Sequence, residues 1–222
     1  MKTLKFKNTA AIFVLAISTV ACSVAPINSH YESARSLRKN NMELSGSFTS
    51  YHTSDEIVQS FNRNFGCKLG YGITDNFDLK ASYQRIIPSD EDFRDEIKGV
   101  NFLSLEPKFT IAPDVFALKV PVNVYFYSME GESSSEFSLS PTLLGTIPVS
   151  DQFEVGVAAS YQIFLEDDTD NFLGFSLGFG LSQDLNQWAI RPEIGYQFMP
   201  DNPDGGFLNF GIGLNFNLDL NK

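Results

Sequence analysis

The chain is poor in charge, in cysteine and in long apolar runs, and each shortage excludes a class of protein. Charged residues make up 19% of the sequence, against roughly 25% in an average soluble domain. Two cysteines cannot build a disulfide framework. No segment has the about 20 consecutive apolar residues that a transmembrane helix needs. The formal net charge of -11 argues against a nucleic-acid partner.

Histidine is also scarce, which limits the catalytic sites that the chain could build. His30 and His52 are the only two, and no zinc, phosphate-loop or dinucleotide motif is present, so we expect no cofactor and no metal site. His52 and Ser54 resemble the His-x-Ser pair of outer-membrane lipid A deacylases, in which a histidine activates a serine nucleophile. We expect no enzyme. A lipid-acting or omptin-like protease barrel is the alternative.

The N-terminus has the features of a secretory signal. Three lysines precede an apolar run at residues 10–17, and small residues follow directly before Cys22. This run is far too short to cross a bilayer. Cleavage before Cys22 removes residues 1–21, including three lysines and no acids, so the mature chain has a formal net charge of -14.

Cys22 is a candidate lipidation site. Val20, Ala21 and Cys22 resemble the end of a bacterial lipobox, in which the cysteine is acylated. Thr19 departs from the large aliphatic residue that usually stands there. Lipidation and plain signal cleavage therefore both remain open.

From residue 42 onward apolar and polar residues alternate with a period of two, which indicates strands. Short turns rich in Asp, Asn and Pro alternate with longer polar segments. The predicted strands are residues 42–51, 63–73, 77–87, 99–111, 115–127, 136–149, 153–164, 171–182, 187–198 and 207–218. We therefore predict an all-β fold: a transmembrane antiparallel up-and-down β-barrel of about 10 strands, with short periplasmic turns and longer extracellular loops.

The expected organisation has three parts. Residues 1–21 are the signal peptide, residues 22–41 are an N-terminal periplasmic segment, and residues 42–222 form the barrel. An even number of strands returns the chain to the side on which it began. We therefore expect the protein in the bacterial outer membrane with both termini in the periplasm.

One face of the predicted strands carries aliphatic residues flanked by aromatic ones, as two interfacial girdles around an apolar band require. The expected girdle residues are Phe77, Tyr83, Phe116, Phe126, Phe153, Tyr161, Trp188, Tyr196 and Phe198. The opposite face carries charges interleaved with glycines and is predicted to line the lumen. The expected lumen charges are Lys68, Asp78, Lys80, Glu106, Lys108, Lys119, Glu154, Arg191 and Glu193. Glu106 and Lys119 should pair across adjacent strands.

Two features favour other interpretations. Four prolines fall well inside predicted strands, where each removes a ladder hydrogen bond: Pro107, Pro121, Pro141 and Pro192. Bulges could absorb them. A soluble periplasmic β-sandwich binding protein is the other alternative, because a period of two also fits a sheet with one face in a core.

The residues 33–37 before the first strand and the turn at 71–79 resemble small bacterial outer-membrane barrels. The phenol-degradation MetA-pathway barrels are similar. That resemblance implies a barrel fold and, for that group, a channel for hydrophobic compounds. It assigns no functional residue.

Most of the acidic residues fall in the predicted long loops. Oxygen-rich clusters such as residues 166–170 could bind a divalent cation weakly, although no EF-hand spacing is present. A solvated acidic rim is the simpler interpretation. We expect outer-membrane lipid as the partner and a non-enzymatic role, either as a narrow pore for small or hydrophobic solutes or as a structural or surface-binding scaffold.

Overall fold

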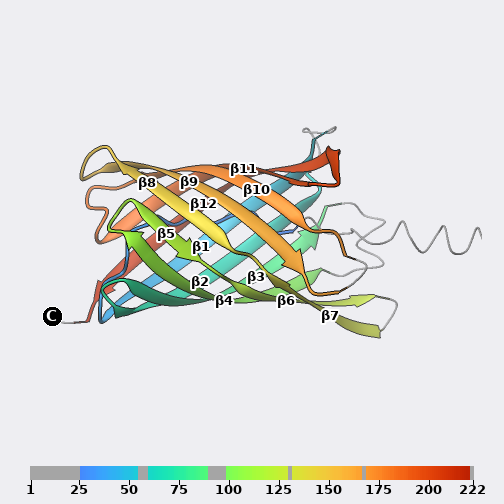
Figure 1. Cartoon of the computed structure of the whole chain (residues 1–222), viewed down its shortest axis with the longest axis horizontal. Helices are drawn as coiled ribbons and strands as arrows, with labels where there is room; N and C mark the ends of the chain where they lie inside the picture. The colour runs from blue at the N-terminus through green and yellow to red at the C-terminus, as the bar shows by residue number, and fades with distance from the viewer. Residues whose placement is uncertain (1–25, 55–59, 90–98, 130–131, 167–168, 221–222) are drawn as a thin grey trace, which may run out of the picture.

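The computed structural model describes residues 26–54, 60–89, 99–129, 132–166 and 169–220, and the regular structure in these residues is β-strand. The strand segments are β1 (Asn41–Thr53), β2 (Asn62–Thr74), β3 (Phe77–Pro88), β4 (Val100–Ala112), β5 (Phe116–Lys119), β6 (Val122–Met129), β7 (Glu132–Leu139), β8 (Thr142–Pro148), β9 (Phe153–Phe164), β10 (Phe172–Leu181), β11 (Trp188–Met199) and β12 (Asn202–Asp219). All pairings are antiparallel and join the segments into one closed barrel (Figure 1).

The segments correspond to ten barrel strands, which confirms the predicted fold. β5 and β6 form one strand interrupted at Pro121, and β7 and β8 form another interrupted at Pro141. β5 pairs with β8, and β6 pairs with β7, so the two interruptions lie side by side. Proline has no N–H to donate to the ladder, which explains the breaks. Pro107 and Pro192 instead lie within continuous strands.

The two ends of the barrel differ in their connections. At one end, here called the short-turn end, β2 joins β3 through residues 75–76 and β4 joins β5 through residues 113–115. At the other, the long-loop end, the expected loops 128–135 and 199–206 are shorter than predicted, because β7 begins at Glu132 and β12 at Asn202. The polar composition of these residues predicts loops where the structure has strands. Strands that project beyond the bilayer meet water on both faces, so their residues can be polar on both.

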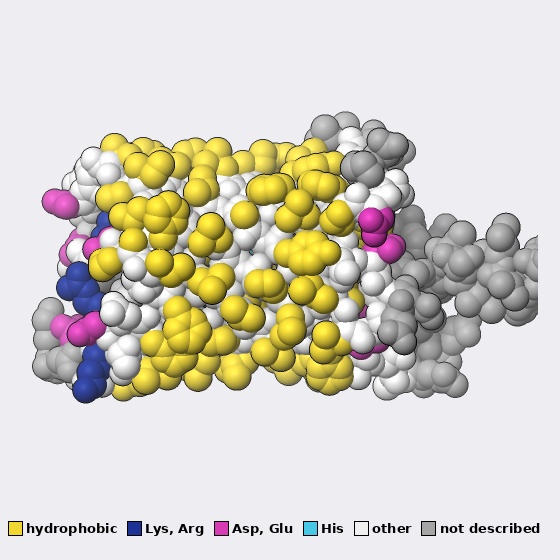
Figure 2. Space-filling view, viewed as in Figure 1, with side chains coloured by type: hydrophobic (Ala, Val, Ile, Leu, Met, Phe, Trp, Pro, Cys, Tyr) yellow, Lys and Arg dark blue, Asp and Glu magenta, His cyan; other side chains and the backbone are white. Residues whose placement is uncertain are grey.

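The outer face is apolar across the middle of the barrel, and charged side chains gather at its two ends (Figure 2). Large exposed hydrophobic side chains include Val122 at 50%, Val157 at 46% and Ile111 at 64% exposure. Charged side chains such as Asp78 and Lys80 are buried inside. This arrangement excludes the β-sandwich, whose apolar face would be in its core. None of the described residues forms a helix that is long and apolar enough to span a bilayer.

The residues expected in the aromatic girdles are all exposed or half-buried on the outer face. Several of them form aromatic pairs. The rings of Phe77 and Phe109 stack at a centroid distance of 4.6 Å, and those of Tyr196 and Phe198 at 5.7 Å. Such pairs lie at both ends of the strands, where amphipathic aromatic rings suit the interface between lipid and water.

Candidate functional site

The lumen is filled by residues 26–40, here called the lumen segment, which runs from one end of the barrel to the other. Near the short-turn end, the Asn40 N–H donates to the Gly72 carbonyl at 2.9 Å. Near the long-loop end, the Gln197 side chain donates to the Pro26 carbonyl. The prediction of a periplasmic segment at residues 22–41 is therefore corrected for residues 26–37, which lie inside the barrel, whereas residues 38–40 lie at its short-turn end and Asn41 begins β1.

The barrel wall satisfies the backbone of the lumen segment directly. The carboxylate of Glu193 accepts the N–H groups of His30 and Tyr31, both at 2.9 Å. The Thr146 hydroxyl accepts the Ala34 N–H at 2.8 Å. A segment without secondary structure has unpaired backbone groups, and burying these unpaired would cost about 1–3 kcal/mol each. The wall thus replaces the partners that a strand ladder would supply.

Asn28 joins the segment to several strands at once. Its N–H donates to the Tyr51 hydroxyl at 2.8 Å, and its side-chain amide donates to Asn209 Oδ1 at 3.3 Å. Its Oδ1 accepts a hydrogen bond from the Ser160 hydroxyl at 3.2 Å. These contacts fix the segment against strands from opposite parts of the sequence. Ser160 belongs to β9 and Asn209 to β12.

Tyr31 adopts a backbone conformation that side chains rarely tolerate, with φ at 49°. Such a residue costs on the order of 1–3 kcal/mol and persists only where its surroundings over-determine it. Its carbonyl accepts the Asn215 amide at 3.1 Å, and its hydroxyl lies 2.6 Å from Thr49 Oγ1. The strain is consistent with a segment held firmly in one register.

Glycines on the inner face make room for the segment. A Cβ at Gly213 would lie 2.6 Å from Tyr31 Cβ, and one at Gly174 would lie 2.8 Å from Asn28 Cγ. The alternation pattern predicts that these glycines face the lumen. The close approach of the lumen segment explains why small residues are needed.

We expect Gly213→Ala to destabilise the folded barrel by about 1–3 kcal/mol, because the added methyl group overpacks against Tyr31. Gly156→Ala is the matched control. Its Cβ would be 3.8 Å from the nearest atom, which is ordinary contact. Urea unfolding in lipid vesicles measures the difference. Equal midpoints for the two variants would contradict the placement of Tyr31 against β12.

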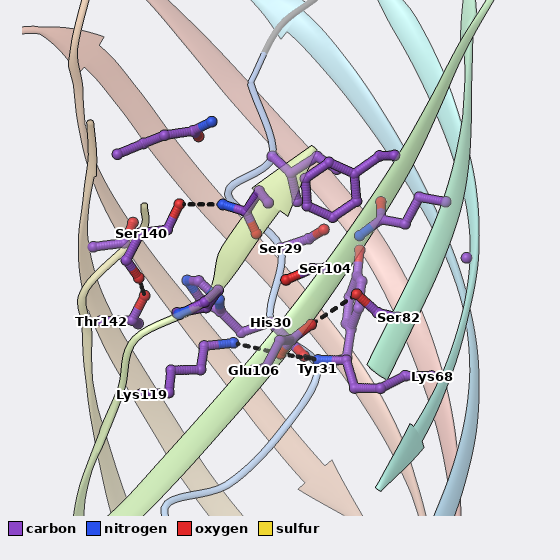
Figure 3. A pocket seen from close by; sticks show the side chains of 18 of the residues that line it. Ser29, His30, Tyr31, Lys68, Ser82, Ser104, Glu106, Lys119, Ser140 and Thr142 are labelled. Carbon is purple, nitrogen blue, oxygen red and sulfur yellow. Dashed lines mark hydrogen bonds and ion pairs between the residues drawn. The ribbon is translucent and has the colours of Figure 1, made fainter. Parts of the chain in front are cut away.

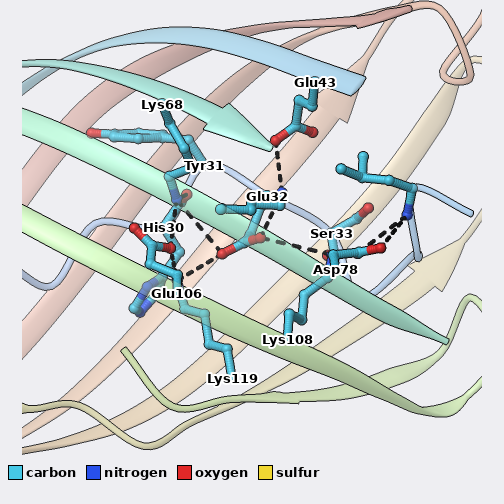
Figure 4. A network of polar contacts seen from close by, with 12 residues as sticks. His30, Tyr31, Glu32, Ser33, Glu43, Lys68, Asp78, Glu106, Lys108 and Lys119 are labelled. Atoms are coloured by element: carbon cyan, nitrogen blue, oxygen red, sulfur yellow. Dashed lines mark hydrogen bonds and ion pairs between the residues drawn. The ribbon is translucent and has the colours of Figure 1, made fainter. Parts of the chain in front are cut away.

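The charge network is centred on Glu32 of the lumen segment (Figure 4). Its carboxylate lies 2.6 Å from the Lys119 ammonium and 2.9 Å from that of Lys80. Lys68 and Lys108 lie farther away, at 3.7 and 3.8 Å. Four lysines from four different strand segments thus converge on one buried carboxylate.

The remaining acids of this layer are shared among the same lysines. Glu106 Oε2 lies 3.0 Å from Lys68 and 3.3 Å from Lys119, so the expected Glu106–Lys119 pair is present. Lys80 also pairs with Glu43 at 2.7 Å, and Lys108 with Asp78 at 3.2 Å. Three wall carboxylates therefore face four lysines, and Glu32 supplies the fourth negative charge.

The structure places all nine predicted lumen charges on the inner face, in three groups. Lys68, Asp78, Lys80, Glu106, Lys108 and Lys119 belong to the layer around Glu32. Glu154 forms a second group with Arg191 at 2.7 Å and with Arg35 of the segment at 2.9 Å. Glu193 binds segment backbone.

Sequence reasoning missed Glu32 and Glu43, which complete the charge network. Glu43 could have been found, because it shares the inner face of β1 with Thr49 and Tyr51. Nothing in the periodicity marks Glu32, which lies outside the strands.

An aromatic collar lines the inside of the barrel at the long-loop end. Its members form a chain of neighbouring rings: Phe102, Tyr125, Phe164, Phe172, Phe207 and Phe61. Centroid distances along this chain run from 4.9 Å between Phe102 and Tyr125 to 6.5 Å between Phe164 and Phe172. Ile27 of the lumen segment packs against the Phe102 and Tyr125 side. The alternation pattern does not mark this collar, because the expected aromatic girdles belong to the outer face.

A polar cavity of about 50 Å³ lies between the collar and the Glu32 layer. Figure 3 shows its lining, including His30, Ser104 and Glu106. A water molecule needs about 10–15 Å³ of such space. The cavity therefore suits a few waters and is far smaller than the about 300–1,000 Å³ of a ligand pocket.

A wider vestibule of about 520 Å³ opens at the short-turn end. Its lining includes Arg35, Arg38, Lys80, Lys108 and Arg191. Arg35 and Arg191 are paired with Glu154, and Lys80 and Lys108 with acids of the Glu32 layer. The vestibule thus ends on the charge network rather than leading through it.

The other sequence candidates do not join the lumen site. His52 lies on the outer face against Phe210, and its Nε2 is 3.0 Å from the Ser50 hydroxyl. Cys67 is an exposed free thiol on the outside. Cys22 and much of the acidic loop sequence, including residues 167–168, lie outside the described residues. Among the described residues, no cluster of three metal-ligating side chains is present.

A closed ten-stranded barrel with an apolar outer band and a polar interior defines the class: this chain is an outer-membrane β-barrel. No protein-family model and no curated protein matches the sequence. Among solved structures, the N-terminal β-barrel domain of Pseudomonas aeruginosa OprF is 16% identical, with 81% of this chain and 98% of that chain covered and a TM-score of 0.35.

Two further solved structures are similar at the same distant level. The translocator domain of the autotransporter NalP from Neisseria meningitidis is 9% identical over 94% of this chain and 95% of that chain, with a TM-score of 0.41. The attachment invasion locus protein Ail of Yersinia pestis is 12% identical over 81% and 99%, with a TM-score of 0.33. These similarities concern the fold alone, and no residue role is transferred.

Proposed function

We propose that the protein is a closed, non-enzymatic outer-membrane scaffold that displays its acidic long loops and conducts no solute while the lumen segment is in place. The observation that carries the proposal is the convergence of Lys68, Lys80, Lys108 and Lys119 on Glu32 of the segment. The wall carries one positive charge more than it can neutralise in this layer, and the segment supplies the missing negative one. Wall and segment are thus complementary in charge.

The two ends of the lumen support the same proposal for different reasons. At the long-loop end Ile27 packs against the Phe102 and Tyr125 side of the aromatic collar, which leaves less room for a hydrated solute. Below it, ion pairs at 2.6–2.9 Å join the segment to the wall. A ten-stranded barrel has a narrow interior once side chains fill it. A peptide segment in that interior occupies the space that a diffusion pore would need.

The alternative is a narrow pore for hydrophobic compounds, as the resemblance to MetA-pathway barrels implies. An apolar solute that passed the collar would next meet the Glu32 layer, in which every described charge is paired and no charged side chain is more than 14% exposed. Such a solute would gain nothing by displacing charges from one another. The charged middle of the lumen therefore favours the scaffold.

Planar-bilayer recording tests the proposal. We expect no resolved current steps from the wild type and a resolved channel from a variant that lacks residues 26–37, because the deletion empties the lumen. Heat-modifiable migration on gels is the control that the deletion variant has folded. Single-channel steps from the folded wild type would contradict the closed scaffold.

A disulfide variant separates a gated pore from a leaky preparation. Asn28 and Gly174 are adjacent, with a Cβ at Gly174 only 2.8 Å from Asn28 Cγ, which suits a disulfide between Asn28→Cys and Gly174→Cys. Cys67 faces outward and cannot reach this pair. The pore alternative, with the segment as its gate, would be favoured by one result: current steps from the wild type and from the reduced variant that are absent from the oxidised variant.

A further inference from the structure

We infer that the chain crosses the membrane once more through its own barrel, so that the mature N-terminus, with Cys22, lies on the same side as the long loops. This inference rests on the proposed function, because it needs the lumen segment inside the barrel. The proposed function requires only that the segment closes the lumen, whereas this inference also states in which direction the segment runs through the barrel. A plug could also enter from the short-turn end and turn back.

The contacts of the segment progress in one direction along the barrel. Arg38 and Asn40 lie beside Gly72 at the short-turn end, where β1 begins. Glu32 lies in the middle layer. Pro26 binds Gln197, two residues before the long-loop end of β11. Each step toward the N-terminus is thus a step toward the long-loop end.

The charges of the segment fit the wall in this direction only. Glu32 is surrounded by lysines, whereas Arg35, on the short-turn side of it, meets Glu154. A reversed segment would bring Arg35 toward the four lysines and Glu32 toward Glu154. Like charges buried side by side are strongly unfavourable in a low-dielectric interior.

The length of chain before Pro26 decides where Cys22 can be. Only four peptide units separate the two residues, and four residues span at most about 14 Å even when fully extended. The apolar band of a transmembrane barrel is about 25 Å tall. Cys22 therefore cannot return to the short-turn end, whatever conformation the residues before Pro26 adopt.

The position of Cys22 has a consequence for its modification. Long loops of outer-membrane barrels face the cell exterior. An acyl group on Cys22 would then enter the outer leaflet beside the barrel, and an unmodified N-terminus would be displayed at the cell surface. The periplasmic N-terminus predicted from an even strand count is replaced by a surface-exposed one. The C-terminal strand β12 still ends at the short-turn end, where Asp219 pairs with Asn41.

Epitope tags on the full-length protein in intact cells test the inference. One variant carries a tag inserted directly after Ser23, and a matched control carries the same tag after Lys222. We expect an impermeant antibody to label the Ser23 tag on intact cells and the Lys222 tag only after permeabilisation. Labelled palmitate in the same cells, with Cys22→Ser as the control, tells whether the displayed N-terminus is acylated.

The outcomes separate this inference from the proposed function. A Ser23 tag that is hidden in intact cells overturns the inference, and equal labelling of both tags does so too. Planar-bilayer recordings of the same tagged protein then show whether the lumen segment closes the barrel to solutes. If the Ser23 tag is hidden and no current steps are recorded, the closed scaffold is supported and the surface-exposed N-terminus is contradicted. A hidden tag with resolved channels contradicts both.

Discussion

Val122→Arg and Val157→Arg are expected to abolish most folding into lipid vesicles. Both side chains point outward from the middle of their strands, with 50% and 46% of their surface exposed. An arginine at mid-membrane on the lipid face of a barrel costs about 2–4 kcal/mol. Because a typical barrel of this size has little stability to spare, a cost of that size should strongly lower the folded yield, measured by heat-modifiable migration.

Val149→Arg is the matched control. Val149 also points outward, with 60% exposure, but it follows the end of β8 at the short-turn end. The cost of arginine falls to about 0–1 kcal/mol near the interface. Depth in the membrane is thus the main difference between control and test. If Val149→Arg folded as poorly as Val157→Arg, the apolar band would not lie where the outer face places it.

Arginine substitutions in the lumen would be a poor control for these substitutions on the lipid face. Ser138 and Asn209 face inward, and both are completely buried. Ser138 accepts hydrogen bonds from Asn123 and Gln162, and Asn209 from Asn28. Arginine at either position would displace a bonded group, so failure there would say little about the membrane.

The sequence predicted the strands and their faces because alternation is a local property. Lys119 and Val122 face opposite sides of the wall simply because of their positions along one strand, and the break at Pro121 follows from its missing N–H. The expected ion pair of Glu106 with Lys119 is present at 3.3 Å, but the register differs from the expected one: Lys119 lies directly opposite Lys108, and Glu106 is its diagonal neighbour.

The content of the lumen could not be predicted in this way. Residues 26–40 form no strand and show no alternation, so no periodic signal assigns them to a face. Their partners are distant in sequence: Asn28 bonds Asn209 across 181 residues, and His30 bonds Glu193 across 163. Such contacts follow only from the closed barrel. The even strand count also takes no account of this segment, because it counts strands alone.

Glu32→Gln is expected to be the most destabilising single change in the lumen. Glutamine keeps the shape of the side chain and removes its charge, so Lys68, Lys80, Lys108 and Lys119 are left with only three wall carboxylates. Breaking a buried ion pair by removing one partner costs about 3–5 kcal/mol, because the other charge stays buried and uncompensated. The midpoint of urea unfolding in lipid vesicles measures the loss, with Asp151→Asn at an exposed turn as the control.

A second substitution distinguishes lost charge balance from lost packing. Lys119 is the lysine nearest to Glu32, at 2.6 Å. Adding Lys119→Met to Glu32→Gln leaves three lysines facing Glu43, Asp78 and Glu106, which restores neutrality. We therefore expect the double variant to be more stable than Glu32→Gln alone, a coupling that contacting charges commonly show. If the two losses simply added, the lysines would not depend on Glu32, and the lumen segment would not be the counter-charge that completes the wall.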